Sequence, residues 1–570
     1  MWQDFIEIVT EVNGKVNDFV WGPPMIIMLL GTGILLTIVT KFLQVRKFGT
    51  SVNETLGETF RSVGKKKNKR KENSISPFEA FATAISGTVG TGNIVGVTSA
   101  IMTGGPGAVF WMWVSAFFGM VTNYSENVLG MYFRKKDKDG EISGGPAYYL
   151  SEGIGRNVKG GFGSFLRGFG KVLGVLAAVF CTFAAIGMSG VQTTKMTQTV
   201  QAVFNMNEKQ NMIIAIVVGI VVAVVLALII LFGIKGIGRT TALLVPFMSL
   251  IFILMSLIII CANITHLGDA IGLIFSNVFK IRSVAGGIGG YMASIIAKKG
   301  FALIMQKGLA RGIFSNEAGL GSSVIAHSAS ATREPVKQGL WGIFEVFFDT
   351  FIICTLTALV ILVTFGNKTD MEGILYAVKA GTEADPELFY ADTQVSMMAF
   401  SKFFGWFGKI VYVIMLPLFA FTTILAWAYY GEKSVDFLFR KTGKKGRKIS
   451  TIVFKVLYVV LVFVAALMVA LGLNGDLAWA ISDTANGLMA LPNLVGLIFM
   501  CVLVAKITKN YFDRKKGKDV APMLSAYPEQ NEEFVQELKE DEAIMQGNEE
   551  VAVAQETKEN VEEPQENSAE

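Results

Sequence analysis

The stretch Ser86-Gly87-Thr88-Val89-Gly90-Thr91-Gly92-Asn93-Ile94-Val95-Gly96 interrupts an apolar run that extends from about residue 78 to residue 101. Glycine is a poor helix former, by about 1 kcal/mol relative to alanine, so this cluster predicts local unwinding. Unwound backbone cannot face lipid, because its polar groups would be unpaired there, and it must line a space enclosed by protein. The alternative is that these glycines let neighbouring helices pack closely.

A second interruption reads Phe314-Ser315-Asn316-Glu317-Ala318-Gly319-Leu320-Gly321-Ser322-Ser323 and also lies within an apolar run. A helix needs about 20 apolar residues to cross the ~30 Å hydrocarbon core of a membrane. Eleven runs of suitable length predict an all-α polytopic membrane protein, and they lie near 25–43, 78–101, 106–132, 172–199, 212–233, 241–263, 301–327, 340–364, 405–429, 451–472 and 477–505.

The two interruptions occupy corresponding positions once the first run is set aside. Each interrupted run then opens a group of five, and because five is odd the second group enters the membrane in the opposite orientation. An inverted repeat whose corresponding helices are both broken is typical of the binding site of a transporter.

The composition excludes several other classes of protein. Of the 570 residues, 52% are hydrophobic and 17% charged, against about 25% charged residues in soluble proteins. The four cysteines and two histidines have no metal-binding spacing, and the chain shows no nucleophile–base constellation or phosphate-binding loop. We therefore expect neither an enzyme nor a cofactor.

The charge distribution predicts the orientation in the membrane. Residues 521–570 contain fifteen acidic residues and two lysines, so the net charge of +5 corresponds to +18 for the preceding 520 residues. Basic residues occur in short blocks between apolar runs, which is typical of cytoplasmic loops and predicts no nucleic-acid partner. With the first basic block inside, the other inner loops are all basic and lie at 134–167, 234–239, 333–337, 440–448 and 506–518. The N-terminus is then external and the C-terminus cytoplasmic in the plasma membrane.

These patterns divide the chain into six parts. The tail is expected to be disordered because it is acidic and poor in aromatic residues. The parts are an external amphipathic segment (1–24), an additional transmembrane helix (25–48), a basic cytoplasmic linker (49–76), a first five-helix repeat (77–264), a second, inverted five-helix repeat (265–507) and an acidic cytoplasmic tail (508–570).

A broken helix supplies what a zwitterion requires. The half-helix that begins at the break offers N–H groups and a positive dipole end to a carboxylate, which makes Thr91, Gly92 and Asn93 candidates. The half-helix that ends there offers carbonyl oxygens to an ammonium group or a small cation. Thr88 and the carbonyls of 87–90 are candidates for Na⁺, a hard ion that favours oxygen ligands.

Further polar side chains lie within the apolar runs. Gln192 either faces the cavity or makes an interhelical hydrogen bond. Thr423 and Trp427 share one helix face, so Thr423 either completes a cation site or bonds to its own helix, and Trp427 either walls the pocket or lies at the interface. Ionisable residues within spans are functional candidates, namely Glu126, Lys195, Arg311, Glu317, Glu345, Asp349, Glu432 and Asp483. Glu317, in the second interruption, either carries a proton, helps to set a cation site, pairs with Arg311 or caps a half-helix.

Several motifs resemble the alanine or glycine:cation symporter family. They are SGTVGTGNIVGV, GGPGAVFWMWVSAFFGM with TNYSEN, GGPAYY, RGIFSNEAGLGSSVIAHSA with VKQGLWGIFEVFFDT, and FAFTTILAWAYYGEK. The resemblance covers nearly all of residues 25–507. It implies a LeuT-type fold, in which two inverted five-helix repeats follow one additional N-terminal transmembrane helix.

The resemblance also implies roles for particular residues. Substrate binding is implied for Thr91, Gly92, Asn93, Gln192, Phe314, Thr423 and Trp427. By analogy with the wider fold, a sodium site is implied at Gly87, Thr88, Thr422 and Thr423.

The function expected from these features is Na⁺-coupled import of a small neutral amino acid, alanine and/or glycine. Na⁺ is the coupling ion, the lipid bilayer is the other partner, and no obligate protein partner is evident. Two alternatives stay open, a proton-coupled amino-acid carrier and a non-transporting amino-acid sensor on the same scaffold.

Overall fold

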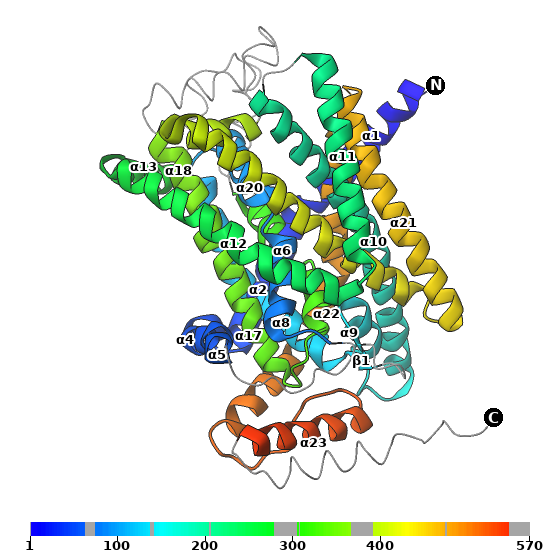
Figure 1. Ribbon diagram of the computed structural model, residues 1–570. Helices are drawn as coiled ribbons and strands as arrows, with labels where there is room; N and C mark the ends of the chain where they lie inside the picture. The colour runs from blue at the N-terminus through cyan, green and yellow to red at the C-terminus, as the bar shows by residue number, and fades with distance from the viewer. Residues whose placement is uncertain are drawn as a thin grey trace, which may run out of the picture.

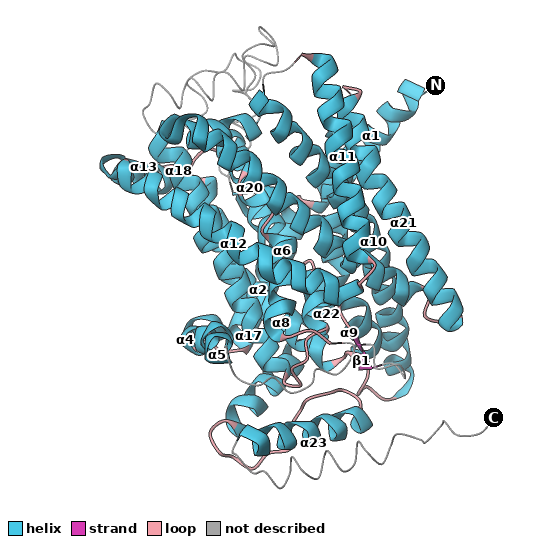
Figure 2. Ribbon diagram, viewed as in Figure 1, coloured by secondary structure: helices cyan, strands magenta, loops and turns pink. Residues whose placement is uncertain are grey.

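The computed structural model describes residues 2–62, 74–136, 142–204, 207–278, 305–306, 308–365, 392–472 and 476–545. This part of the chain is almost entirely helical (Figures 1 and 2), apart from a two-stranded antiparallel pairing of β1 (Lys135–Lys136) with β2 (Ile142–Ser143). The all-α membrane architecture predicted from the sequence is confirmed.

The helices before residue 279 include a π-helical turn, η1, and a 3₁₀ turn, η2. In order they are α1 (Trp2–Val20), α2 (Pro23–Val39), α3 (Leu43–Arg46), α4 (Phe48–Val52), η1 (Asn53–Gly57), α5 (Glu58–Ser62), α6 (Pro77–Thr88), η2 (Thr91–Asn93), α7 (Val95–Gly104), α8 (Ala108–Tyr132), α9 (Pro146–Gly153), α10 (Gly160–Phe204), α11 (Glu208–Ile230), α12 (Gly233–Ala262) and α13 (Ile264–Ser276).

The helices after residue 304 include a longer π-helical segment, η3. They are α16 (Ser323–Ser328), α17 (Pro335–Val346), η3 (Phe347–Cys354), α18 (Thr355–Phe365), α20 (Asp392–Leu438), α21 (Gly443–Ala470), α22 (Asp476–Arg514) and α23 (Pro528–Met545).

Local sequence explains where several helices begin. Proline occupies the first turn of α2, α6, α9 and α17, where its missing N–H costs no hydrogen bond. Ser76 and Glu79 form a capping box at the start of α6, and Asn207 and Gln210 form another at the start of α11.

Eight helices of the described residues are long and apolar enough to cross a membrane, or nine if the bent pair α6 and α7 forms one span. Two of the eleven expected spans are not among these nine. The helix α8 has 25 residues, but its second half is polar and buried against other helices. The run near 301–327 lies partly outside the described residues.

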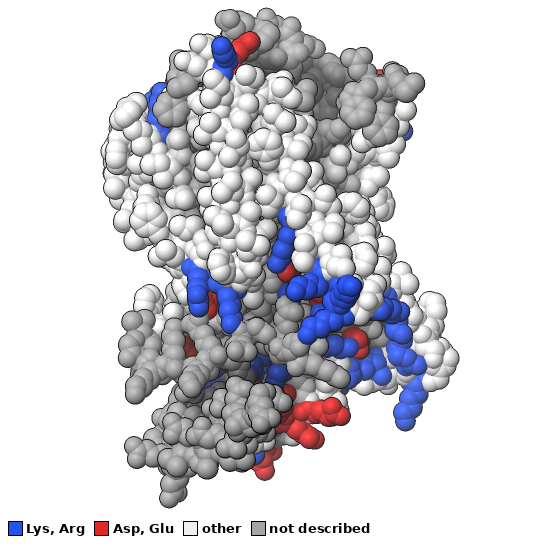
Figure 3. Space-filling view, turned by 45° about the vertical axis from the view of Figure 1, so that its right-hand side comes forward, with Lys and Arg blue, Asp and Glu red and all other residues white. Residues whose placement is uncertain are grey.

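The outer helices present apolar side chains outward. On α11, α12 and α21, large hydrophobic residues such as Val217, Leu243 and Val456 are more than half exposed, at 51%, 73% and 58%. In a membrane protein this surface contacts lipid, and the polar side chains turn toward the interior of the bundle. Figure 3 shows an uncharged band with Lys and Arg gathered below it.

The acidic tail differs from what the sequence predicts, and the basic linker contains helices. The tail was expected to be disordered, but Pro528–Met545 forms α23, which lies across one end of the bundle in Figure 1. The first part of the segment predicted to be a basic cytoplasmic linker folds into α4, η1 and α5. Ser51 there donates a hydrogen bond of 2.7 Å to the carbonyl of Leu340 in α17. Residues 63–73 and 546–570 lie outside the described part.

Candidate functional site

The first interruption is a true break between two helices. The helix α6 ends at Thr88, Val89 and Gly90 leave the helical conformation, and η2 forms one 3₁₀ turn before α7 begins at Val95. The two halves meet at an angle of 56°. The unwinding predicted from the glycine cluster is therefore confirmed.

The second interruption is also a break. A helix ends at Asn316, residues 317–322 form a loop, and α16 begins at Ser323. Three residues of the loop have positive φ, namely Glu317 at 53°, Gly319 at 94° and Gly321 at 78°. Glycine at the last two positions avoids the steric cost that other residues meet in this conformation.

The two breaks lie against each other in the interior. The Asn93 amide nitrogen in η2 lies 2.9 Å from Ser315 Oγ, at the end of the helix that precedes the second break. A Cβ atom built on Gly92 would lie 3.9 Å from the Phe314 ring. The structure therefore brings together three residues that the sequence nominated from two distant segments, namely Gly92, Asn93 and Phe314.

A buried carboxylate joins the two breaks. Asp349 in η3 accepts hydrogen bonds from the Asn93 amide at 2.5 Å and from Ser315 Oγ at 2.8 Å. The Thr350 hydroxyl lies 2.9 Å from the same carboxylate. All four side chains are at most 1% exposed. This cluster offers carboxylate, hydroxyl and amide oxygens, which are ligands that a hard cation favours.

Asp349 and Ser315 were not among the site residues nominated from the sequence. Asp349 had been noted as an ionisable residue within a span, which is a signal of function but does not identify the partner. The π-helical geometry of η3 is a second signal, since π-bulges are frequent at functional sites. That geometry is not readable from the sequence.

Gln192 of α10 contacts the unwound stretch directly. Its side-chain oxygen accepts a hydrogen bond of 2.9 Å from the Thr91 hydroxyl and lies 3.4 Å from the Thr91 backbone nitrogen. Gln192 is 2% exposed and Thr91 1% exposed. Of the two possibilities left open for Gln192, the structure thus shows an interhelical hydrogen bond, and that bond is made to the candidate substrate-binding stretch itself.

Thr423 of α20 lies beside the end of α6. Its hydroxyl oxygen is 2.9 Å from the carbonyl of Ser86 and 3.0 Å from the carbonyl of Phe419 in its own helix. A Cβ atom on Gly90 would lie 2.4 Å from this hydroxyl oxygen, so the glycine permits a close approach.

The other nominated cation ligands bond locally. The Thr88 hydroxyl donates to the carbonyl of Ile85 at 3.1 Å, and the Thr422 hydroxyl donates to the carbonyl of Phe419 at 3.0 Å. Gly87 packs on Tyr430 of α20, with a built Cβ 2.8 Å from the phenol oxygen. The structure thus places Gly87 and Thr423 at the contact between α6 and α20, while the Thr422 hydroxyl lies 3.8 Å from Met248 of α12.

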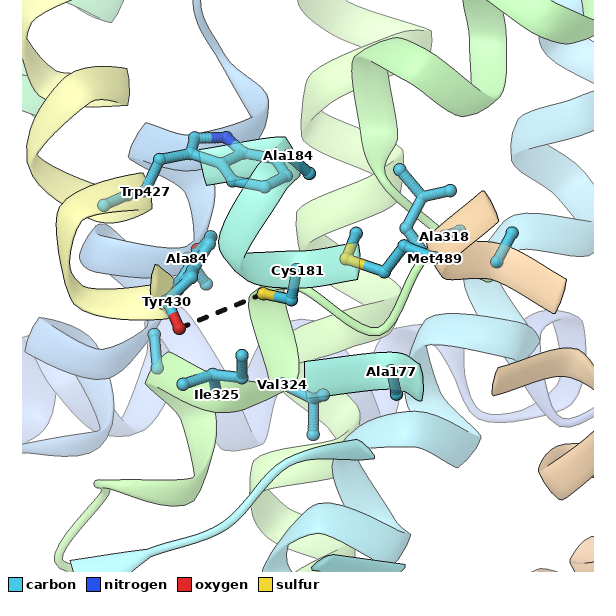
Figure 4. Packing of buried hydrophobic residues seen from close by; sticks show 14 of the residues in the cluster. Ala84, Ala177, Cys181, Ala184, Ala318, Val324, Ile325, Trp427, Tyr430 and Met489 are labelled. Atoms are coloured by element: carbon cyan, nitrogen blue, oxygen red, sulfur yellow. Dashed lines mark hydrogen bonds between the residues drawn. The ribbon is translucent and has the colours of Figure 1, made fainter. Parts of the chain in front are cut away.

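Trp427 contacts the loop of the second break. Its indole nitrogen donates a hydrogen bond of 3.1 Å to Glu317, whose other carboxylate oxygen accepts from Ser322. Trp427 and Tyr430 lie together with Cys181 and Ala184 in the close-packed region shown in Figure 4. Trp427 is fully buried. Its ring packs against Tyr430 and its indole nitrogen bonds to Glu317, so both parts of the side chain are held in place.

Other buried ionisable groups are also paired. His327 lies 2.8 Å from Glu345 and 2.6 Å from Gln338, and Glu126 accepts a hydrogen bond from Asn493. No group of three or more His, Cys, Asp or Glu side chains that could hold a metal ion occurs in the described ranges. A cation at the breaks would therefore be held chiefly by neutral oxygens, with Asp349 as the nearby charge.

Comparisons with known proteins identify the family of the chain. The model of the sodium:alanine symporter family matches residues 6–525. The chain is 36% identical to the sodium/alanine symporter AgcS of Methanococcus maripaludis over 520 residues, which cover 90% of this chain and 99% of that protein. It is 34% identical to the putative sodium/proton-dependent alanine carrier protein YrbD of Bacillus subtilis, covering 90% of this chain and 95% of that protein.

Among solved structures, the chain is similar to MhsT in complex with L-phenylalanine. The TM-score is 0.46 at 14% identity, with 77% of this chain and 99% of that chain covered.

Proposed function

Since the chain belongs to the sodium:alanine symporter family, we propose that it imports a small neutral amino acid, alanine and/or glycine, together with Na⁺. The observation that carries this proposal is the meeting of two broken helices in the interior, where Asn93 of one break bonds to Ser315 beside the other. Such a junction offers backbone dipoles of both signs to a zwitterion.

The substrate carboxylate binds at the first break in this proposal. The helix α7 begins directly after η2, so its positive dipole end lies at Thr91, Gly92 and Asn93. Gln192 holds Thr91 in place, and Phe314 and Trp427 form apolar walls that limit the size of the side chain.

Two places near the break are suited to a sodium ion. One is the contact between α6 and α20, where Gly87 and the Thr423 hydroxyl lie. The hydroxyls of Thr88 and Thr422, which bond to their own helices in this structure, would have to turn toward the ion to join this site. The other is the cluster of Asn93, Ser315 and Asp349, where a carboxylate adds negative charge. An ion at either place orders the unwound backbone and thereby raises the affinity for substrate, and linkage requires the reverse effect as well.

The driving force is sufficient for concentrative uptake. Moving one positive charge across 100 mV releases about 2.3 kcal/mol. A tenfold Na⁺ gradient adds about 1.4 kcal/mol. Together they sustain an accumulation of roughly 500-fold for one coupled ion.

The proposal includes the orientation of the protein in the membrane. Basic side chains gather at the end of the molecule where α23 lies, and the positive-inside rule assigns that end to the cytoplasm of a cell with this protein in its plasma membrane.

Uptake by the purified protein in liposomes tests the proposal. We expect accumulation of labelled alanine or glycine when a Na⁺ gradient is imposed, and competition by small neutral amino acids only. Accumulation that follows an imposed H⁺ gradient without Na⁺ would instead establish the proton-coupled carrier, for which the buried Glu317 in the second break is the candidate. Binding without accumulation under any gradient would establish the sensor.

A further inference from the structure

The helix α23 lies outside the residues that the family model matches. The family model ends at residue 525, and α23 spans Pro528–Met545. It lies against the basic end of the bundle in Figure 1 rather than extending away from it. The family match therefore does not account for the contacts between α23 and the bundle.

One face of α23 carries acidic residues that meet basic loops. Glu533 pairs with Lys136 of β1, and Glu537 pairs with Arg333 in the connection between α16 and α17. These two glutamates are four residues apart and share a helix face. The Arg333–Glu537 pair is largely shielded, with side-chain exposures of 12% and 14%, so solvent screens it less than a surface pair.

A buried aromatic residue of α23 contacts basic side chains beside these ion pairs. Phe534 is 1% exposed, and its ring centre lies 5.2 Å from the Arg134 guanidinium and 5.0 Å from that of Arg333. A cation over an aromatic face is held more strongly when it is desolvated than when it is exposed. Burial and the neighbouring Arg333 lower the pKa of Arg134 to about 9, whereas Glu537 acts in the opposite direction. The helix thus supplies negative charge where two guanidinium groups repel.

The residues that α23 covers belong to two different elements of the bundle. Arg134 follows α8 directly, and its guanidinium donates to the carbonyls of Ser330 at 2.6 Å and Thr332 at 2.7 Å, beyond the end of α16. The segment before α23 is tied to the same region, since Ala526 N donates to the carbonyl of Tyr132 at 2.8 Å. The helix therefore fixes the inner end of the second broken helix relative to the inner end of α8.

We infer that this basic surface is a docking site for an acidic amphipathic helix, that α23 occupies it, and that the docked helix restrains transport. The inference rests on the proposed function, because alternating access requires elements at one end of the bundle to move relative to one another. If the contacts of α23 break during each transport cycle, they add to the free-energy barrier for the motion of these two elements. Releasing α23 then accelerates turnover.

The test compares two double variants of the full chain in liposomes. Glu533→Gln with Glu537→Gln removes both ion pairs, whereas Glu529→Gln with Glu532→Gln makes the same charge change at exposed positions of the same helix. We expect the first variant to raise the maximal rate of Na⁺-driven alanine uptake at least twofold and the second to match the unmodified chain. Phe534→Ala should raise the rate as the first variant does.

Ionic strength supplies a second readout. Raising it from about 0.01 M to 0.15 M with an inert salt at constant Na⁺ shortens the Debye length from about 30 Å to 8 Å. The unmodified chain should then transport faster, and the Glu533/Glu537 variant should change less.

Release of the helix is measured directly by labelling. A Leu538→Cys substitution, in a Cys261→Ser background, should react faster with a maleimide when Glu533 and Glu537 are neutralised. Unchanged labelling would overturn the docking by ion pairs, and faster labelling without faster uptake would overturn the restraint. If the unmodified chain shows no Na⁺-driven uptake at all, the proposed function fails instead, and the labelling result still decides the docking.

Discussion

At the scale of single residues, Asp349 is the group that the tertiary structure adds to the candidate site. It is fully buried and accepts hydrogen bonds from Asn93 and Ser315, which belong to the two breaks. A buried carboxylate is costly unless it is hydrogen-bonded and paired with positive charge. A bound cation would supply that positive charge, so replacing Asp349 tests whether a cation binds beside it.

We predict that Asp349→Asn raises the Na⁺ concentration for half-maximal uptake at least tenfold, equivalent to about 1.4 kcal/mol. The amide keeps the shape of the side chain and removes its charge. The matched control is Asp269→Asn, an exposed aspartate on α13, which should leave the Na⁺ dependence unchanged. An unaltered Na⁺ response in Asp349→Asn, at normal membrane expression, would remove this residue from the cation site.

Trp427 is the second residue whose replacement is informative, because it is fully buried and bonded to the loop of the second break. Replacing a buried tryptophan with alanine leaves a cavity, and such changes typically cost 3–5 kcal/mol of stability. We predict that Trp427→Ala admits bulkier amino acids, measured as competition against labelled alanine uptake. Trp427→Phe should retain more of the size selection, since the ring still fills most of the space.

The control for this series is Trp406→Ala on the same helix, where the side chain is 73% exposed. Its substrate profile should match that of the unmodified chain. If Trp427→Ala also keeps the original profile, the indole does not line the pocket.

At the scale of elements, the site depends on helices that stop and restart within the bundle. The break between α6 and α7 leaves Gly90 extended and close to Thr423 of α20. The break before α16 uses Gly319 and Gly321 at positive φ. Each break is specified by local sequence, but the contact between the breaks is a tertiary one, made by Asn93 and Ser315 and bridged by Asp349 of η3.

Two glycines of the first break region give a matched pair of substitutions. We predict that Gly90→Ala lowers the uptake rate at least tenfold, because its Cβ would lie 2.4 Å from Thr423 Oγ and must displace it. Gly96→Ala on α7 should be tolerated, since no atom lies within 4 Å of the Cβ position apart from its own chain neighbours and the backbone of its own helix. Equal activity of the two variants, measured as initial uptake rates at equal expression, would contradict a tightly packed break.

At the scale of the whole molecule, the distribution of charge predicts the orientation in the membrane. We expect a cysteine at Lys209, at the start of α11, to react with an impermeant maleimide in intact cells. A cysteine at Lys518, after α22, should react only after the cells are made permeable. Both belong in a Cys261→Ser background, because Cys261 is an exposed native thiol. The reverse pattern would invert the proposed topology.

The sequence by itself determined the class of the protein and the location of both breaks. Long apolar runs specify membrane helices because an unpaired backbone group is costly in lipid, and clustered glycines weaken a helix wherever they occur. These effects are local, so Thr91, Gly92 and Asn93 could be nominated without coordinates, whereas a role for Phe314 was implied only by the family resemblance. The family motifs added Gln192 and Trp427, which the structure places against the breaks.

Only the tertiary structure decided which side chains meet. Asp349 bonds to Asn93 across 256 positions of the chain, and the hydroxyl of Thr423 meets Ser86 across 337. The folding of α23 onto Arg134 and Arg333 contradicts the disorder that its acidic composition suggested. Composition indicates how much apolar surface a segment can bury on its own. The helix α23 is stabilised instead by basic side chains of other elements, which contact its glutamates and the ring of Phe534.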